Sequence, residues 1–205
     1  MADKSSMTKG NVLLLSLWVA FLIAGFGALE IYSNTPGEPG LAIRQWPATS
    51  QLKPHSDLPS LLVFLHPKCS CSRATLGELE RLYPTLIGKA NITFIFYKPL
   101  DQSDDWVKNS YWDMTQVYDG AERWIDAGGI EAERFGVRTS GQVALYDPTG
   151  HLVFRGGITP ARGHMGDSTG REAILAYFHG EDLTDKQQTP VFGCAIRKSE
   201  IADSK

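Results

Sequence analysis

The longest hydrophobic stretch of the chain runs from residue 10 to residue 29 and contains no charged side chain. A helix of about twenty residues rises about 30 Å, which matches the hydrocarbon thickness of a bilayer. Its few polar residues do not form a continuous face, so the pattern does not fit a helix packed against a soluble core. We therefore expect a transmembrane anchor over residues 10–30, preceded by a short tail of residues 1–9.

The charges that flank this stretch predict its orientation. Lys4 and Lys9 precede it, and the next basic residue after it is Arg44. Basic residues favour the cytoplasmic side of a span, so residues 1–9 are expected in the cytoplasm and the rest of the chain outside it. A cleaved signal peptide is the alternative, although the stretch is longer than a usual signal core. Both interpretations export the remaining chain.

Residues 31–59 show little hydrophobic periodicity. Prolines and glycines interrupt them at seven positions: Pro36, Gly37, Pro39, Gly40, Pro47, Pro54 and Pro59. This composition is typical of a linker, and it predicts a spacer that lifts the following domain off the membrane.

The pattern between residues 60 and 180 alternates strand-like and helix-like segments. Apolar or alternating runs predict strands at 61–65, 92–97, 123–125, 142–146 and 152–154. Helical spacing predicts helices at 72–82, 130–135 and 171–179, and residues 98–119 are expected to form an insert with a short helix. This order predicts an α/β domain with a mixed sheet, helices on both faces and a thioredoxin-like fold. Residues 181–205 are expected to form a mostly polar C-terminal tail that carries Cys194.

Composition and charge exclude several classes of protein. Of the 205 residues, 42% are hydrophobic and 21% are charged, which is not the composition of a disordered chain or a multi-span membrane protein. The formal net charge of −3 offers no basic excess for binding nucleic acid. Three cysteines are too few for a disulfide scaffold, and the odd number leaves one thiol outside any intramolecular pair.

Two of these cysteines, Cys69 and Cys71, lie where the first predicted strand gives way to a helix. A helix N-terminus stabilises a thiolate, and the neighbouring His66 and Lys68 can add positive charge. The thiolate is the nucleophile of disulfide exchange, so Cys69 is expected to be reactive. A pair of small buried structural cysteines is the alternative reading.

Residues 64–73 (FLHPKCSCSR) resemble the active site of thioredoxins, in which a strand leads through a proline into C-x-x-C at a helix start. In this comparison Cys69 falls on the family's nucleophilic cysteine. Ser72 falls on the second cysteine, and Cys71 is displaced by one position. The motif is therefore C-x-C-S, which departs from the family pattern.

Residues 135–157 resemble the second half of the membrane-anchored thioredoxin-like proteins of the TlpA and ResA type. Those proteins carry a cis-proline just before the position of Val143. This chain has Thr-Ser-Gly-Gln at residues 139–142 instead, so the resemblance does not imply the ordinary thioredoxin mode of docking a substrate.

A more specific resemblance is to the bacterial thioredoxin-like proteins called RedB. It covers about residues 60–196 and rests on four motifs, at 66–74, 139–141, 156–164 and 189–194. Together with the predicted anchor, it implies a single-pass protein of the bacterial inner membrane whose C-terminal domain lies in the periplasm.

The first functional interpretation is a thiol–disulfide oxidoreductase with the catalytic residues Cys69, Cys71 and Cys194. The partner would be a protein thiol or disulfide. Cys69 would attack a disulfide of the partner, and a second thiol would resolve the mixed disulfide without a cofactor. A Cys69–Cys71 bridge closes a very small, strained ring. Cys194 could resolve instead, because the C-terminal tail is long enough to fold back.

The second interpretation is a metal site. Cys69, Cys71, His66 and His164 offer soft ligands for copper as Cu(I) or for zinc, and Cys194 is a further thiol. The SCO-type copper proteins, which also have an anchor and a thioredoxin-like fold, pair two cysteines with a histidine. This resemblance implies a metallochaperone as the alternative to the oxidoreductase. A peroxiredoxin-like peroxidase is disfavoured, because Pro67 alone does not supply the Thr and Pro that cradle a peroxide.

Overall fold

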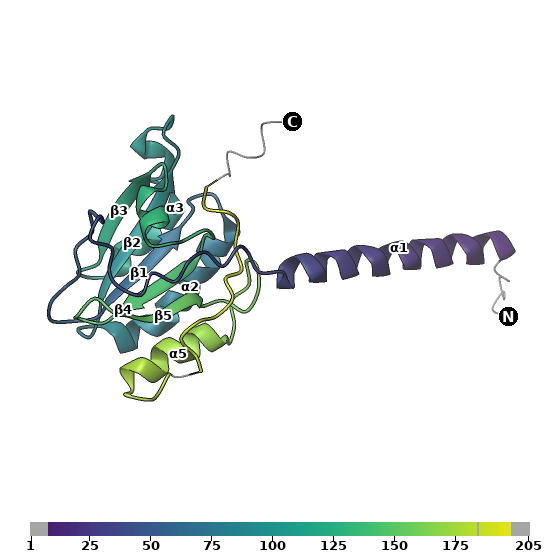
Figure 1. Ribbon diagram of the computed structural model, residues 1–205. Helices are drawn as coiled ribbons and strands as arrows, with labels where there is room; N and C mark the ends of the chain where they lie inside the picture. Colours follow the sequence, from purple (N-terminus) through teal and green to yellow (C-terminus); the bar gives the residue numbers. More distant parts are fainter. Residues whose placement is uncertain (1–7, 184, 198–205) are drawn as a thin grey trace.

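The computed structural model describes residues 8–183 and 185–197 (Figure 1). A long N-terminal helix projects from an α/β domain, and the bounds of all helices and strands follow. The helices are α1 (Lys9–Asn34), α2 (Ser70–Leu86), α3 (Ser110–Met114), α4 (Ile130–Arg134) and α5 (Thr169–Phe178), with single 3₁₀ turns η1 (Asp104–Trp106) and η2 (Thr115–Val117). The strands are β1 (Ser60–Leu65), β2 (Asn91–Lys98), β3 (Glu122–Ala127), β4 (Gln142–Tyr146) and β5 (Leu152–Gly157).

The five strands form one mixed sheet in the order β3-β2-β1-β4-β5. β1, β2 and β3 are parallel, whereas β4 runs antiparallel to both β1 and β5. The central strand β1 is buried along its whole length, as a continuous apolar run predicts for a strand covered on both faces. This strand order, with β1 leading directly into a long helix, is the thioredoxin-like fold.

Alternate residues of β1 face two separate hydrophobic clusters. Leu61, Val63 and Leu65 pack with the apolar side chains of α2 and α5. Leu62 and Phe64 pack on the other side, with residues of α4 and with the chain that precedes β1. The predicted arrangement of helices on both faces of a mixed sheet is therefore confirmed.

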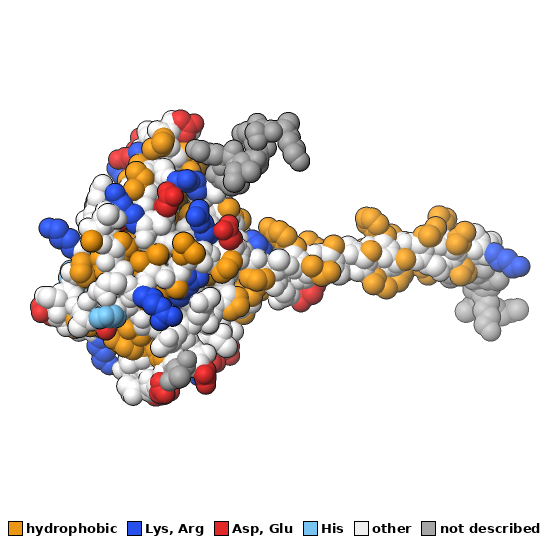
Figure 2. Space-filling view, in the orientation of Figure 1, with side chains coloured by type: hydrophobic (Ala, Val, Ile, Leu, Met, Phe, Trp, Pro, Cys, Tyr) orange, Lys and Arg blue, Asp and Glu red, His pale blue; other side chains and the backbone are white. Residues whose placement is uncertain are grey.

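The helix α1 stands away from the domain, and none of its side chains is buried (Figure 1). Its mean hydropathy over the best 18-residue window is 2.5, so by length and composition it is able to cross a membrane. Figure 2 shows hydrophobic side chains along this helix, which in water would be an unfavourable exposure. The helix is longer than predicted, because it continues to Asn34.

The segment expected to be a spacer packs on the domain instead. The Trp46 ring lies 5.1 Å from the rings of both Phe135 and Tyr146, and its Nε1 donates a hydrogen bond to the carbonyl of Leu52. The amide of Leu41 donates to the carbonyl of Gly136 at 2.8 Å. Trp46 and Leu52 make hydrophobic contacts with the domain that the proline-rich composition does not predict. Much of residues 35–59 therefore packs on the domain and is not a free tether.

The helix α2 is also longer than predicted, from Ser70 to Leu86 rather than 72–82, and it continues past Pro84. Its earlier start places Cys69 at the N-cap and Cys71 inside the first turn. The strand predictions were close, and β4 matches the predicted range of 142–146.

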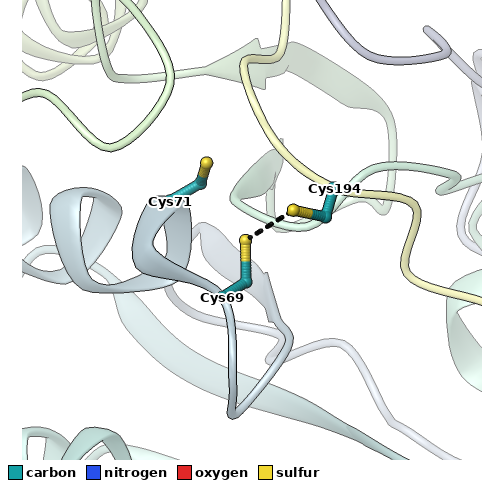
Figure 3. A group of neighbouring side chains, drawn as sticks. All are labelled: Cys69, Cys71 and Cys194. Carbon is teal, nitrogen blue, oxygen red and sulfur yellow. Dashed lines mark hydrogen bonds between the residues drawn. The ribbon is translucent and has the colours of Figure 1, made fainter. Parts of the chain in front are cut away.

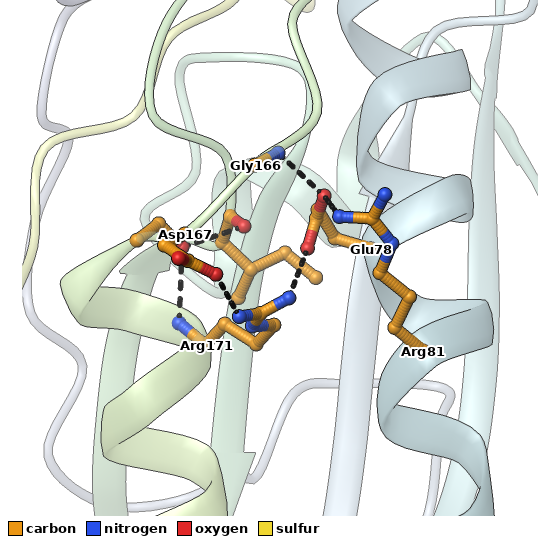
Figure 4. Close-up of polar contacts among 7 residues, drawn as sticks. Glu78, Arg81, Gly166, Asp167 and Arg171 are labelled. Carbon is orange, nitrogen blue, oxygen red and sulfur yellow. Dashed lines mark hydrogen bonds and ion pairs between the residues drawn. The ribbon is translucent and has the colours of Figure 1, made fainter.

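A buried carboxylate links α2 to α5 and to the loop before α5 (Figure 4). Glu78 is fully buried on α2, and its two oxygens accept hydrogen bonds from Arg81 and Arg171. It also accepts from the amide of Gly166 at 2.7 Å. This network holds the loop between β5 and α5, which contains Arg162 and His164, against the middle of α2.

Candidate active site

Cys69 lies at the junction between β1 and α2. The chain leaves β1 at Leu65, and a tight turn is closed by a hydrogen bond from the Cys69 amide to the carbonyl of His66. Cys69 has extended backbone angles at the N-cap, and Cys71 lies in the first helical turn. Both side chains are buried, with 4% and 3% of their surfaces exposed.

Cys194 reaches this junction from the other end of the chain. Residues 187–196, which we call the C-terminal strap, first run beside β5, where backbone hydrogen bonds join Arg155 to Gln187 and Thr189. The strap then crosses to the loop before β4, where the amide of Ser140 donates to the carbonyl of Cys194 at 2.9 Å. The possibility that the tail folds back to the cysteine motif is therefore what the structure shows.

The three sulfur atoms form one cluster, and Figure 3 shows the Cys194 sulfur pointing toward that of Cys69. The Sγ atoms of Cys69 and Cys194 are 3.2 Å apart, within hydrogen-bonding distance. The Sγ atoms of Cys69, Cys71 and Cys194 all lie within 4.8 Å of one another. All three cysteines are free thiols in this structure.

The environment lowers the pKa of the Cys69 thiol to about 4. The largest cause is hydrogen bonding from the Cys71 thiol, and the Ser140 side chain, the Cys194 amide and the Cys194 thiol add to it against the opposing effect of burial. The same hydrogen bonds raise the pKa values of the two thiols that donate them, Cys71 and Cys194. The bond to Cys69 raises the pKa of the Cys71 thiol, whereas burial, followed by the bond to Cys69, raises that of Cys194.

The source of this acidity differs from the one expected from sequence. Lys68 and His66 were expected to supply positive charge, but the Lys68 ammonium lies over the Trp106 ring at 4.6 Å. The His66 ring stacks on Tyr97, and burial lowers the His66 pKa, which favours its neutral form. The pKa of Cys69 is lowered instead by hydrogen bonds from Cys71, Ser140 and Cys194.

Ser72 and Ser140 are structural parts of the site to which the sequence pattern assigns no role. Ser72 is fully buried, and its hydroxyl accepts a hydrogen bond from the amide of His66 at 2.9 Å. The hydroxyls of Ser72 and Ser140 are 3.1 Å apart. Ser72 thus connects β1, α2 and the loop before β4. It stands where the thioredoxin pattern has its second cysteine, and this replacement of cysteine by serine is the sequence signal that could have identified Ser72.

The loop of residues 139–141 replaces the proline segment of the thioredoxin pattern. The described residues contain no cis peptide bond. The Gly141 amide donates to the carbonyl of Phe64 at 2.7 Å, and Gly141 has a φ of +86°, a conformation that favours glycine. A Cβ on Gly193 would lie 1.9 Å from the carbonyl oxygen of Ser140, so only glycine lets the strap approach the loop this closely.

The two histidines of the predicted metal site do not join the sulfur cluster. Within the described residues, the group of cysteines, histidines and acidic side chains placed to share one ion consists of Cys69, Cys71 and Cys194 alone. The Nδ1 of His66 accepts from the amide of Lys68, and the exposed His164 lies 2.7 Å from the carbonyl of Arg162. The structure therefore does not assemble the predicted set of two cysteines with His66 and His164.

Arg162 connects the strap to the end of α1. Its guanidinium donates to the carbonyls of Gly193 and Thr35 and lies 5.1 Å from the centre of the Tyr32 ring. Its amide donates to the carbonyl of Ser33 at 3.0 Å. The sulfur cluster is therefore on the side of the domain from which α1 emerges.

Comparisons with known proteins support the fold. No protein-family model matches the chain, and no curated protein matches its sequence significantly. A hypothetical protein from Sinorhizobium meliloti superposes with a TM-score of 0.56 at 20% identity, covering 82% of this chain and 97% of that one. An uncharacterized conserved protein from Geobacillus kaustophilus gives a TM-score of 0.55 at 18% identity, covering 82% and 94%. The exposed lipoprotein thioredoxin of Streptococcus pneumoniae gives 0.45 at 22% identity, covering 62% and 87%.

The strand order and directions define the class of the protein as thioredoxin-like. The Sinorhizobium meliloti and Geobacillus kaustophilus proteins are only 20% and 18% identical to this chain, so the similarity to them concerns the fold.

Proposed function

We propose that this protein is a membrane-anchored, extracytoplasmic thiol–disulfide oxidoreductase with Cys69 as the nucleophile. The observation that carries the proposal is the 3.2 Å separation of the Cys69 and Cys194 sulfur atoms at the start of α2. A hydrogen-bonded thiolate beside a second thiol is an arrangement that suits disulfide exchange.

In the reductive direction, the Cys69 thiolate attacks one sulfur of a partner protein's disulfide. A mixed disulfide forms, and the partner's other sulfur leaves as a thiolate. Cys194 then loses its proton and attacks Cys69 Sγ, and the Cys69–partner sulfur bond breaks to give a Cys69–Cys194 disulfide. The two partner sulfurs leave as thiolates, and they become a dithiol by taking up the proton from Cys194 and a second proton from water. Two electrons move to the partner, and the reverse sequence oxidises a dithiol. No cofactor is needed, because the electrons pass between sulfur atoms.

Cys194 rather than Cys71 is assigned as the resolving thiol. A Cys69–Cys71 bridge would close a small ring across one intervening residue, whereas Cys194 approaches from a separate segment without this restriction. Cys71 is assigned to the catalytic site as the residue whose hydrogen bonding lowers the pKa of Cys69.

The assigned location is the bacterial inner membrane, with a single span and the domain in the periplasm. Support comes from the apolar α1, from the lysines that precede it and from the resemblance to the RedB, TlpA and ResA proteins. The partner is a protein thiol or disulfide rather than a nucleic acid.

A reporter enzyme fused after Lys205 is expected to be active only outside the cytoplasm, and cytoplasmic activity or release of a shortened soluble form would contradict the anchor.

The redox proposal is tested on the full chain in detergent. Mild oxidation followed by peptide mapping should find the Cys69–Cys194 disulfide, and the reduced protein should reduce insulin. Cys69→Ser should abolish this activity, and Cys194→Ser should accumulate a mixed disulfide with the substrate. Ser70→Ala, an exposed position between the two motif cysteines, is the matched control and should keep the wild-type rate. An active Cys69→Ser variant, or a disulfide that excludes Cys69, would refute the assignment.

A further inference from the structure

We propose that the reduced protein binds one Cu(I) ion between the sulfur atoms of Cys69, Cys71 and Cys194. This inference goes beyond the oxidoreductase activity, because it uses all three thiols at once. It also differs from a site of two cysteines with histidines, since neither His66 nor His164 belongs to the cluster.

The geometry of the cluster fits a three-coordinate ion. The three Sγ atoms lie within 4.8 Å of one another. With metal–thiolate bonds of about 2.3 Å, three sulfurs around a trigonal ion are about 4 Å apart. Cys69 and Cys194 need to separate slightly from 3.2 Å, and no segment has to move to bring a ligand in.

The donor set favours Cu(I) over zinc. Soft thiolates select Cu(I), whereas structural zinc sites are almost always four-coordinate. In the part of the chain that the structure describes, no histidine or carboxylate completes the cluster as a fourth ligand. Three sulfurs without a fourth protein ligand match the lower coordination number that Cu(I) accepts.

The third ligand is held in position by backbone contacts. The carbonyl of Cys194 accepts from the Ser140 amide, and the carbonyl of Gly193 accepts from Arg162. Cys69 and Cys71 are fixed by α2 and are buried, whereas Cys194 is exposed. An ion can therefore enter from the strap side and meet three ligands whose backbones are already placed.

The same sulfurs cannot bind the ion and form a disulfide. A Cys69–Cys194 disulfide removes two of the three ligands, so the oxidised protein is expected to lose the site. Conversely, the bound ion occupies the nucleophile and is expected to stop disulfide exchange. Binding is thus restricted to the reduced protein.

The test uses the full chain in detergent, reduced and kept without oxygen. Cu(I) is titrated in competition with a chromogenic Cu(I) chelator, and X-ray absorption measures the number of Cu–S bonds. We expect one Cu(I) per chain with three sulfur ligands, and no binding after oxidation to the disulfide. Each of Cys69→Ser, Cys71→Ser and Cys194→Ser should weaken binding at least tenfold, whereas His66→Ala and His164→Ala should bind as the wild type does. Melting temperatures identify any variant that fails to fold.

Several results would overturn the inference. They are a stoichiometry near zero, binding that survives oxidation, a histidine variant that weakens binding as much as a cysteine variant, or a preference for Zn(II) over Cu(I). Insulin reduction by the metal-free protein is measured in parallel. Exchange without copper binding refutes the copper site alone, whereas copper binding without exchange refutes the oxidoreductase and leaves the copper site standing.

Discussion

The acidity of Cys69 depends on groups from three separate parts of the chain. Cys71 belongs to α2, Ser140 to the loop before β4, and Cys194 to the strap. A hydrogen bond to an anionic acceptor stabilises the charged form, so each group lowers the pKa of the thiol that it contacts. The lowered pKa of Cys69 is therefore a property of the assembled site and not of the helix start alone.

The first prediction concerns alkylation of the reduced protein by iodoacetamide. The rate at Cys69 should have an inflection near pH 4, because the thiol is ionised above its lowered pKa of about 4. Cys71 and Cys194 should remain unreactive up to pH 8, because their pKa values are raised. Mass spectrometry of each cysteine peptide across pH 3–9 measures the three profiles.

Ser140→Ala should move the Cys69 inflection to higher pH, because one hydrogen bond to the thiolate is lost. Ser70→Ala serves as the control and should leave it unchanged. An inflection at pH 8 or above in the wild type would show that the hydrogen bonds do not ionise Cys69.

The second prediction concerns the midpoint potential of the Cys69–Cys194 pair. Between pH 5 and 8, reduction should add two electrons but only one proton, because Cys69 stays a thiolate while Cys194 is protonated. The potential should therefore fall by about 30 mV per pH unit, rather than the about 59 mV that two protons would give. Equilibration with glutathione at several pH values measures this slope, and a two-proton slope throughout the range would contradict the low pKa of Cys69.

At the level of elements, the strap completes the site by close contacts between backbones. Gly193 passes directly over the carbonyl of Ser140, and Gly37 on the chain that leaves α1 packs against Thr139 and Gly193. These contacts leave no space for side chains. The position of Cys194 relative to Cys69 therefore depends on glycines as much as on the cysteines themselves.

The third prediction follows from this packing. In Gly193→Ala the new Cβ would lie 1.9 Å from the Ser140 carbonyl oxygen, so the strap must shift. Such overpacking typically costs about 1–3 kcal/mol, and the melting temperature should fall. The yield of the Cys69–Cys194 disulfide under mild oxidation should fall as well. Ala195→Ser changes an exposed neighbour on the same strap and should leave both quantities unchanged, whereas an unaffected Gly193→Ala variant would show that the strap is not held at this point.

The elements of the domain could be predicted from sequence where hydrophobic pattern determines them. β1 and β4 are fully buried and mostly apolar, and their positions were predicted closely. The strap could not be predicted as an ordered element, because backbone hydrogen bonds to β5 and to the Ser140 loop hold its polar part. The role of Ser140 could not be predicted from sequence either, because it depends on a contact with Ser72, which lies 68 residues earlier.

At the level of the whole molecule, Arg162 joins three parts that are far apart in the sequence. It contacts the end of α1 through Tyr32, Ser33 and Thr35, and it contacts the strap through Gly193. The chain that follows α1 then packs on the domain rather than forming a flexible tether. The helix α1 and the sulfur cluster are therefore linked through the contacts of Arg162.

The fourth prediction tests this connection. Arg162→Ala should raise the rate of amide hydrogen exchange in residues 33–38 and 190–195, because both segments lose hydrogen bonds to the guanidinium. Mass spectrometry of the full chain in detergent measures this exchange. Arg73→Ala removes an exposed arginine from α2 and should not change exchange in either segment. If the Arg162 variant exchanges like the wild type, the guanidinium does not hold the two segments together.

For the proposed membrane-anchored oxidoreductase, the Arg162 contact has a consequence for how the domain would meet a partner. Once α1 is embedded in a bilayer, the sulfur cluster stays within a thin layer just above the lipid headgroups. The search for a partner then becomes two-dimensional, and the rate of encounter depends on how densely partners populate that surface rather than on their bulk concentration. A dithiol carried by another protein of the same membrane would then meet Cys69 by lateral diffusion, whereas a freely dissolved one would have to reach the membrane surface first.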